Sequence, residues 1–274
     1  AKDYGVAPMM FLSTISAQGE GSIPNEIELV NNPESQERVI RNTLRILEEK
    51  GYYGVNIYLQ YLSLENRARV DEFITRVAGI LHSAGYRVIL TISPRVILET
   101  REIRFEEIDY SSFARVADGI LFLNYEGGIT YGVPGTIAPV NILRGMLDYA
   151  INTVPPEKIF LGVPTTGYDW ELPYVPGVTW GNAITTDAAV QIAVDEGVPI
   201  LFNQEAQAPY FYYEREELHL VWFKDARSFD AIGALVPEYG LQGLSIWNIM
   251  NFNTQLWFVI NLNYNIEKVG DGEF

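Results

Sequence analysis

Short apolar segments alternate along the chain with longer stretches in which apolar residues recur every three or four positions. The short segments have the length and β-branched content of buried strands, and the longer ones have the period of amphipathic helices. This alternation is typical of βα units in a parallel sheet. The expected strands are Pro8–Ser16, Gly54–Tyr61, Arg87–Ser93, Gly119–Tyr125, Lys158–Pro164 and Leu241–Trp247.

Two of the expected helices have clear end signals. Asn32-Pro33-Glu34 supplies a capping side chain, a proline at the first helical position and a first-turn acid, and Gly51 ends this helix. A second helix begins at Ser63 and ends at Gly85. Further helices are expected at about Tyr110–Ala117, Val140–Thr153 and Ser228–Tyr239.

The segment from Tyr168 to Asp225 interrupts the alternation. It holds a short helix near Asp187–Glu196, followed by Tyr210–Tyr213 and His219–Phe223, which have the pattern of an antiparallel hairpin. We therefore expect an α+β insertion over residues 168–225, before the last strand of a single domain that spans residues 1–274.

The number of strands is too small for a closed barrel. A (β/α)8 barrel, or TIM barrel, has eight strands, whereas about six can be identified here before the C-terminal Tyr264–Val269 segment. Either two strands are not visible in the pattern, or the chain begins inside an α/β barrel whose first two units are absent. In the second case Pro8–Ser16 and Leu241–Trp247 would be unpaired edges. The candidates for covering the opening are a second copy in a homodimer, a partner chain, and the C-terminal Tyr264–Val269 segment.

Composition narrows the function classes. The 274 residues carry 19 Lys and Arg against 35 Asp and Glu, a net charge of −16 that argues against nucleic-acid binding. The chain has no cysteine, and we find no apolar run of the roughly 20 residues that span a bilayer. It shows no signal peptide or lipidation motif. His82 and His219 are the only histidines, so we expect neither a metal site nor a cofactor.

The carboxyl ends of the expected strands, where α/β barrels place their functional side chains, are rich in aromatic and amide groups and poor in carboxylates. Aromatic faces stack on sugar rings, and amides and hydroxyls match sugar hydroxyls, so this set favours a carbohydrate ligand. The ends are Ser13–Ser16, Tyr58–Tyr61, Ser93-Pro94-Arg95, Asn124-Tyr125-Glu126, Thr165–Tyr168 and Trp247-Asn248.

Several short motifs stand out along the chain. They are Asn31-Asn32-Pro33-Glu34, Gly51-Tyr52-Tyr53-Gly54-Val55-Asn56-Ile57, Ala138-Pro139, Pro155-Pro156-Glu157-Lys158, Gly162-Val163-Pro164, Gly167-Tyr168-Asp169-Trp170, Ala206-Gln207-Ala208-Pro209 and Val221-Trp222-Phe223-Lys224-Asp225-Ala226-Arg227-Ser228. In this order they resemble glycoside hydrolase family 18, in particular its spore-cortex-lytic N-acetylglucosaminidase branch. The resemblance implies a (β/α)8 barrel with an α+β insertion between the seventh and eighth strands, in which Pro8–Ser16 matches the third strand and the first two βα units are absent.

The same resemblance implies impaired catalysis. The catalytic strand of the family ends in Asp-x-Glu: the glutamic acid protonates the glycosidic oxygen, and the aspartate orients the N-acetyl group of the substrate, which is the nucleophile. Here Tyr58 stands at the aspartate position and Gln60 at the glutamic acid position. An amide has no ionisable proton to donate, and general acid catalysis contributes about 10²–10⁴ in rate. We therefore expect hydrolysis to be nearly abolished.

Other site positions of the family are partly retained. Tyr125 matches a tyrosine that polarises the N-acetyl group, and Glu126 stands where an aspartate is expected. Trp247 matches the tryptophan beneath the sugar. Tyr168 and the Asp169-Trp170 pair open the insertion and are candidate substrate-binding residues, with a structural role as the alternative.

Three hypotheses follow. The first is a catalytically impaired protein that has a structural role or binds N-acetylated glycan such as peptidoglycan or chitin, located outside the cell in a wall or spore. The second is a weak or altered glycosidase in which Glu126 or another acid at a strand end donates the proton. The third is an assembly protein whose open barrel is completed by a partner chain. A turnover assay separates the first two, and solution mass tests the third.

Overall fold

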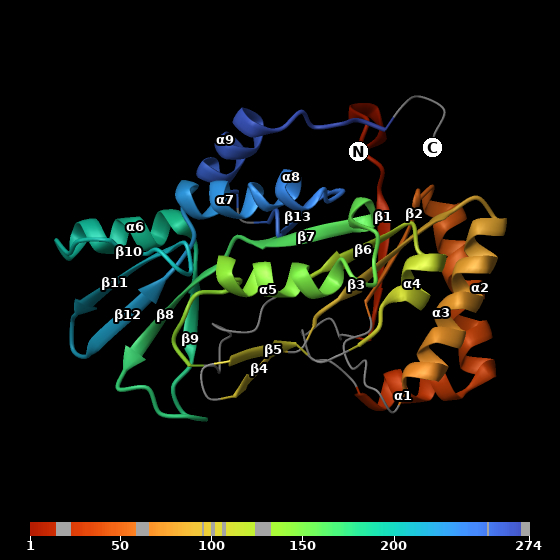
Figure 1. Ribbon diagram of the computed structural model, residues 1–274, viewed down its shortest axis with the longest axis horizontal. Coiled ribbons are helices and arrows are strands. Elements are labelled where there is room, and N and C mark those ends of the chain that lie inside the picture. Colours follow the sequence, from red (N-terminus) through yellow and green to blue (C-terminus); the bar gives the residue numbers. More distant parts are fainter. Residues whose placement is uncertain are drawn as a thin grey trace.

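A six-stranded parallel sheet forms the centre of the computed structural model, which describes residues 1–14, 23–58, 66–94, 96–99, 102–105, 108–123, 133–250 and 252–269. Its strand order is β1-β2-β3-β6-β7-β13 (Figure 1). The strands are β1 Met9–Ser13, β2 Gly54–Tyr58, β3 Arg87–Ile92, β6 Gly119–Phe122, β7 Ile159–Pro164 and β13 Gly243–Trp247. Each lies within, and is shorter than, one of the six predicted strands. The predicted ends beyond residues 14, 58 and 123 fall outside the described residues.

Helices cover the outer face of this sheet (Figure 1). They are α2 Pro33–Lys50, α3 Arg67–Ser83, α4 Ser111–Val116, α5 Val140–Ala150, α7 Ala226–Gly233 and α8 Leu235–Tyr239. Two further helices pack on these, α1 Ile23–Asn31 against α2 and α3, and α9 Thr254–Asn263 against α7. The end signals of α2 are confirmed, because the Asn32 side chain accepts hydrogen bonds from the Glu34 and Ser35 amides and Gly51 has a φ of 63°. The described part of the second helix begins at Arg67, and its predicted start at Ser63 lies outside the described residues.

The predicted helix at Ser228–Tyr239 is two helices, α7 and α8, which meet at Ala234. Pro237 has no amide hydrogen with which to bond the Gly233 carbonyl four residues earlier. That carbonyl instead accepts a hydrogen bond from the Tyr264 hydroxyl. The helix is therefore interrupted at this point: Pro237 offers no N–H to the Gly233 carbonyl, and the Tyr264 hydroxyl donates to it instead.

Side chains of the sheet alternate between its two faces, as the two-residue period of a strand requires. Val55 and Ile57 point outward into the main core, as do Leu90 and Phe122 of neighbouring strands. The alternating positions point to the concave inner face. Small residues shape this inner layer, because a Cβ on Gly119 would lie 2.7 Å from the Phe160 ring.

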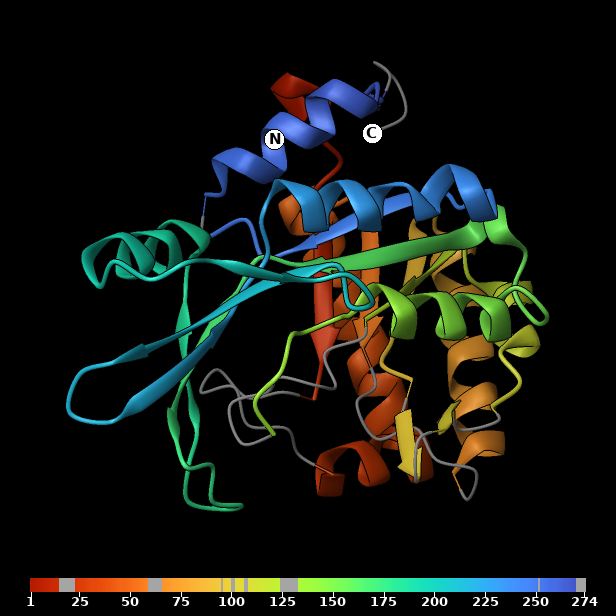
Figure 2. The ribbon, with the colours of Figure 1, turned by 60° about the vertical axis from the view of Figure 1, so that its left-hand side comes forward.

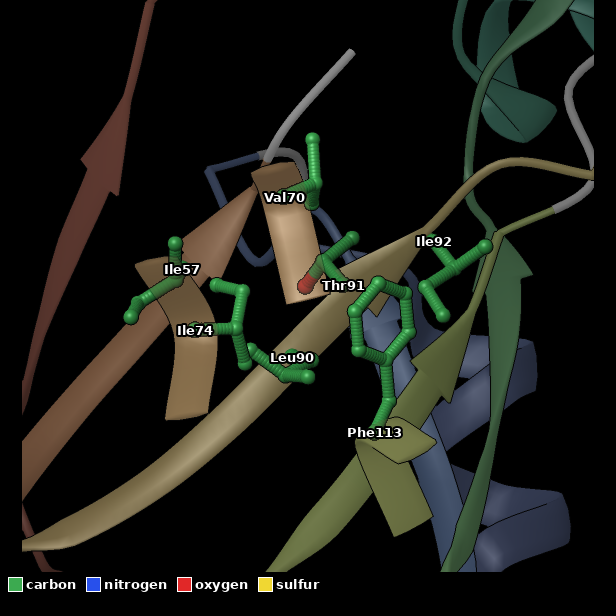
Figure 3. A pocket seen from close by; sticks show the side chains of 7 residues that line it. All are labelled: Ile57, Val70, Ile74, Leu90, Thr91, Ile92 and Phe113. Carbon is green, nitrogen blue, oxygen red and sulfur yellow. The ribbon is translucent and has the colours of Figure 1, made fainter. Parts of the chain in front are cut away.

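A small void lies between the sheet and the helices. It measures about 20 Å³, and Figure 3 shows Ile57, Ile74 and Phe113 around it. The one polar residue in its lining, Thr91, donates its hydroxyl hydrogen to Asn56 on the concave face of the sheet, at 2.7 Å. A site that holds water or a ligand needs several polar partners, so this void belongs to the packing of the core.

A separate five-stranded antiparallel sheet stands at one side of the molecule, in the order β10-β11-β12-β8-β9 (Figure 2). The predicted hairpin is confirmed as β11 and β12. Helix α6 packs on this sheet through Ala189 and Ala193, which contact Phe211 and Val221. The elements are β8 Gly167–Leu172, β9 Gly181–Ile184, α6 Thr186–Asp195, β10 Leu201–Asn203, β11 Ala208–Glu214 and β12 Leu218–Trp222. A second short hairpin, β4 Val96–Glu99 with β5 Glu102–Phe105, was not expected from the sequence.

One buried cation connects the insertion to the loop that precedes α5. Lys224 follows β12, is 1% exposed, and donates from Nζ to the Ala138 carbonyl at 3.1 Å. Its own carbonyl accepts the Thr186 hydroxyl at 2.8 Å. Burial lowers the pKa of Lys224 to about 7, and the charge of Asp225 opposes this shift.

Both edges of the parallel sheet are open within the described residues. β1 pairs only with β2, and β13 pairs only with β7. Helix α9, which follows β13, buries Leu256 and Ile260 but leaves Phe258 and Leu262 exposed. A helix that is apolar on every side is typically buried on every side. The exposed face of α9 that carries Phe258 and Leu262 is therefore more apolar than a solvent-facing helix surface usually is.

The C-terminal segment crosses between the two edges at the amino ends of the strands. The Val269 amide donates to the Gly5 carbonyl at 3.0 Å, and a Cβ on Gly5 would lie 2.9 Å from Lys268 Cβ. The segment after α9 thus lies against the turn that precedes β1, and it adds no strand to either edge.

The first prediction concerns Lys224. Between about pH 7 and its ordinary value of 10.5, the unfolded lysine binds a proton that the folded lysine lacks, so its unfavourable contribution declines as pH rises. We expect Lys224→Met to stabilise the protein most at the low end of this window. The gain should shrink by up to about 1.4 kcal/mol per pH unit toward the high end. Urea denaturation of both proteins across the window measures this difference, and parallel stability curves would contradict it.

The second prediction concerns the open edges. Unpaired strand edges beside exposed apolar side chains favour pairing with another chain, so we expect the protein to form a dimer in solution. Sedimentation equilibrium measures the mass, and hydrogen exchange at β1 and β13 should be slow in the dimer. A stable monomer whose two edge strands exchange quickly would show that the opening needs no cover.

Candidate functional site

Three aromatic side chains meet on the concave face, two from the carboxyl ends of β2 and β13 and one from the middle of β1. Phe11 of β1 lies 6.2 Å from Tyr58 of β2 and 5.9 Å from Trp247 of β13, between ring centroids. We call Phe11, Tyr58 and Trp247 the aromatic floor. Phe11 and Trp247 are each 42% exposed, whereas Tyr58 is 9% exposed. The floor therefore offers two accessible ring surfaces beside one buried ring.

The backbone of Trp247 is fixed by the end of the neighbouring strand. The Thr165 amide donates to the Trp247 carbonyl at 3.1 Å, and the Thr165 hydroxyl exchanges hydrogen bonds with Asn248, accepting from its amide at 3.2 Å and donating to its carbonyl at 3.0 Å. The Trp247–Asn248 peptide is cis. The hydrogen bonds with Thr165 hold the backbone of Trp247 and Asn248 in place, even though the Trp247 ring is exposed.

Tyr58 is tied into a polar layer beneath the floor. Its hydroxyl lies 3.1 Å from the Ser93 hydroxyl, in a hydrogen bond in which either oxygen is the donor. Two residues earlier on β2, Asn56 also points inward, where it accepts from Thr91. The described polar groups at the floor are hydroxyls and an amide. Gln60, Tyr125 and Glu126, which the sequence also places here, lie outside the described residues.

Asp169 lies inside the insertion. Its carboxylate accepts the Tyr213 hydroxyl at 2.6 Å and contacts His219 Nδ1 at 3.0 Å. Burial and the Asp169 carboxylate raise the pKa of Tyr213 well above its usual value. His82, the other histidine, contacts Asp118 at 2.9 Å, just before the amino end of β6. These contacts give Asp169 a structural role, and its role in substrate binding stays a prediction.

Tyr168 and Trp170 share the opposite face of the insertion sheet. Their rings lie 5.6 Å apart, and Tyr168 is half-buried and packs against the main core. Trp170 is fully buried, and a Cβ on Gly181 would lie 2.7 Å from its indole. Their position links the insertion to the barrel, and their substrate contacts also stay predictions.

Sequence reasoning missed one buried acid at this end of the sheet. Glu26 lies on α1, is 0% exposed, and accepts the Thr14 hydroxyl at 3.3 Å, just beyond β1. Charged side chains are almost never fully buried without partners. The available signal was an acid within the apolar half of a short helix that follows a strand end.

Similar proteins include lytic enzymes of bacterial spores. The cortical fragment-lytic enzyme of Bacillus anthracis is 31% identical over 265 residues, which cover 96% of this chain and 61% of that protein. The di-N-acetylchitobiase of Rattus norvegicus is 28% identical over 163 residues, which cover 51% of this chain and 44% of the relative. The chain thus spans about three fifths of the lytic enzymes that it matches.

Solved structures give the same picture. The crystal structure of the Bacillus cereus spore cortex-lytic enzyme SleL superimposes with a TM-score of 0.88 at 30% identity, covering 98% of this chain and 62% of that one. A chitinase from Chromobacterium violaceum, at 22% identity and a TM-score of 0.83, shares the fold; its alignment covers 95% of this chain and 81% of the chitinase chain. The family model of the glycosyl hydrolases family 18 matches residues 19–251. The chain belongs to the glycosyl hydrolases family 18.

Proposed function

We propose that this protein binds a glycan containing N-acetylglucosamine on the aromatic floor and hydrolyses it slowly or not at all. The observation that carries the proposal is the inward position of Tyr58, bonded to Ser93 beside two exposed aromatic rings. A sugar ring stacks on the exposed Trp247 face, and the hydroxyls and amides around it supply orientation.

The impairment follows from the chemistry of the residues at the catalytic positions. By resemblance to the family, Tyr58 and Gln60 stand where the orienting aspartate and the acid are expected. A phenol whose oxygen is shared with Ser93 offers no carboxylate to orient the acetamido group of the substrate. An amide at residue 60 donates no ionisable proton. Both functions of the carboxylate pair are therefore lost together.

The names of the relatives support both the proposed class of ligand and its proposed location in a wall or spore. Their names describe enzymes that act on cortical fragments of spores and on di-N-acetylchitobiose, so a peptidoglycan or chitin-like glycan in a wall or spore is the proposed ligand. None of the described helices is both long and apolar enough to cross a membrane. We also propose that the six strands correspond to the third to eighth strands of the family barrel.

A second candidate function is altered hydrolysis with a relocated acid. Glu26 favours it, because this buried carboxyl group lies beside Thr14 at the same end of the sheet as the aromatic floor. A buried acid near a bound sugar is a candidate proton donor. In this reading Glu26 would replace the missing glutamic acid.

The third prediction tests binding. Trp247→Ala removes the exposed indole, and we expect the dissociation constant for an N-acetylglucosamine hexamer to rise about tenfold, as for the loss of a stacking contact of about 1.4 kcal/mol. Tyr212→Ala, which removes a similarly exposed aromatic ring from the insertion, is the matched control. Isothermal titration calorimetry measures both. If the Trp247 variant and the parent bind the hexamer with equal affinity, the glycan does not bind on the aromatic floor.

The fourth prediction tests catalysis. We expect turnover of the same hexamer below about 1 s⁻¹, a tenth of the enzyme median. Gln60→Glu alone should restore little, since the acetamido group stays unoriented, whereas Tyr58→Asp combined with Gln60→Glu should raise the rate. Product release by chromatography measures it.

The two candidate functions differ in one result of this assay. Turnover by the parent that Glu26→Gln abolishes and Glu28→Gln leaves intact would establish the relocated acid. Circular dichroism of each variant confirms that it folds. Glu28 is the matched control because it lies on the same short helix and is exposed.

A further inference from the structure

A hollow of about 330 Å³ lies at the outer end of the insertion sheet, away from the aromatic floor. We call it the hairpin hollow. Its volume is at the low end of the roughly 300–1,000 Å³ of small-molecule sites, which suits one sugar ring. It is lined by Glu171, Leu172, Pro173, Val178, Thr179, Trp180, Asn182 and Glu217.

Strand pairing brings the polar groups of the hollow to one face. Asn182 pairs with Asp169, and Glu171 is two residues beyond Asp169, so both project from the same side of the sheet. His219 pairs with Glu171, and Glu217 is two residues before His219, so it projects there as well. Helix α6 covers another part of this face, over Phe211, Tyr213 and Val221. The hollow is thus an uncovered part of a face that is packed elsewhere.

The loop that forms the opposite wall is held by its own hydrogen bonds. The Thr179 hydroxyl accepts from the Val175 amide at 2.9 Å, and the Thr179 amide donates to the Val175 carbonyl at 2.9 Å. Trp180 follows directly and is 56% exposed. The indole is therefore presented by an ordered turn beside β9.

The charge of the hollow is not neutralised from within the described chain. Neither the Glu171 carboxylate nor the Glu217 carboxylate has a hydrogen-bond or ion-pair partner among the described residues. The nearby cations are engaged elsewhere, because Arg215 pairs with Glu196 at 2.6 Å and His219 pairs with Asp169. The net charge of −16 adds a field that attracts cations.

We propose that the hairpin hollow binds a glucosamine residue that carries a free amine, with its ring on Trp180 and its ammonium between Glu171 and Glu217. An exposed indole accepts both a sugar face and a cation, and two carboxylates select the charged amine over the neutral acetamide. The proposal rests on the proposed glycan binding. It gives the protein a second contact with the same polymer, one that distinguishes glucosamine residues from N-acetylglucosamine residues.

The test compares two soluble oligomers by calorimetry, a glucosamine tetramer and an N-acetylglucosamine tetramer. Glu171→Gln combined with Glu217→Gln should weaken binding of the glucosamine tetramer at least about tenfold and leave the acetylated tetramer unaffected. Glu214→Gln combined with Glu216→Gln is the matched control, since both residues are exposed in the same hairpin and the change in net charge is identical. Trp180→Ala should weaken the same interaction.

Three results would overturn the proposal: equal losses in the two double variants, no preference of the parent for the glucosamine tetramer, or binding of calcium alone that depends on Glu171 and Glu217. Failure of the proposed function is a different result. In that case Trp247→Ala would leave binding of the acetylated tetramer unchanged, while the amine-dependent binding at the hollow would still be measured by itself.

Discussion

The ring contact between Phe11 and Trp247 is the interaction on which the architecture of the site depends. These residues belong to the two edge strands of the six-stranded sheet, which are not hydrogen-bonded to one another, yet their rings lie 5.9 Å apart. The sheet is therefore curled tightly enough for side chains of its first and last strands to come into contact across the opening. The same curl places Tyr58 beneath them and creates one concave surface.

Charge is distributed unevenly over this fold. The acidic side chains are mostly at the surface, where their mutual repulsion is screened, whereas Lys224 is buried where the insertion meets the loop before α5, and its ammonium donates to the Ala138 carbonyl. Burying a cation is unfavourable, and the lowered pKa of Lys224 expresses that cost. The free energy of unfolding therefore depends on pH through this one buried amine.

Patterns with strong local causes were predictable from the sequence. The six strands followed from runs such as Val55 to Ile57, and α2 followed from the Asn32 cap and Gly51. Helix α9 was not found because its apolar residues surround the helix and leave no amphipathic period. The break at Ala234 depended on Tyr264, thirty residues away, which local reasoning does not see. Trp247 and Tyr58 came from family resemblance, whereas Glu26 became visible only through burial.

The hydrogen bond between Val269 and Gly5 has a topological consequence. It brings the two ends of the described fold together at the amino ends of the strands, opposite the aromatic floor. Two ends of a domain that lie side by side on the face away from a site are the geometry that tolerates circular permutation. Joining residue 269 to residue 5 with a short linker and opening the chain at an exposed turn such as residues 215–217 should preserve the sheet order. The aromatic floor should therefore form in a chain whose elements follow one another in a permuted order.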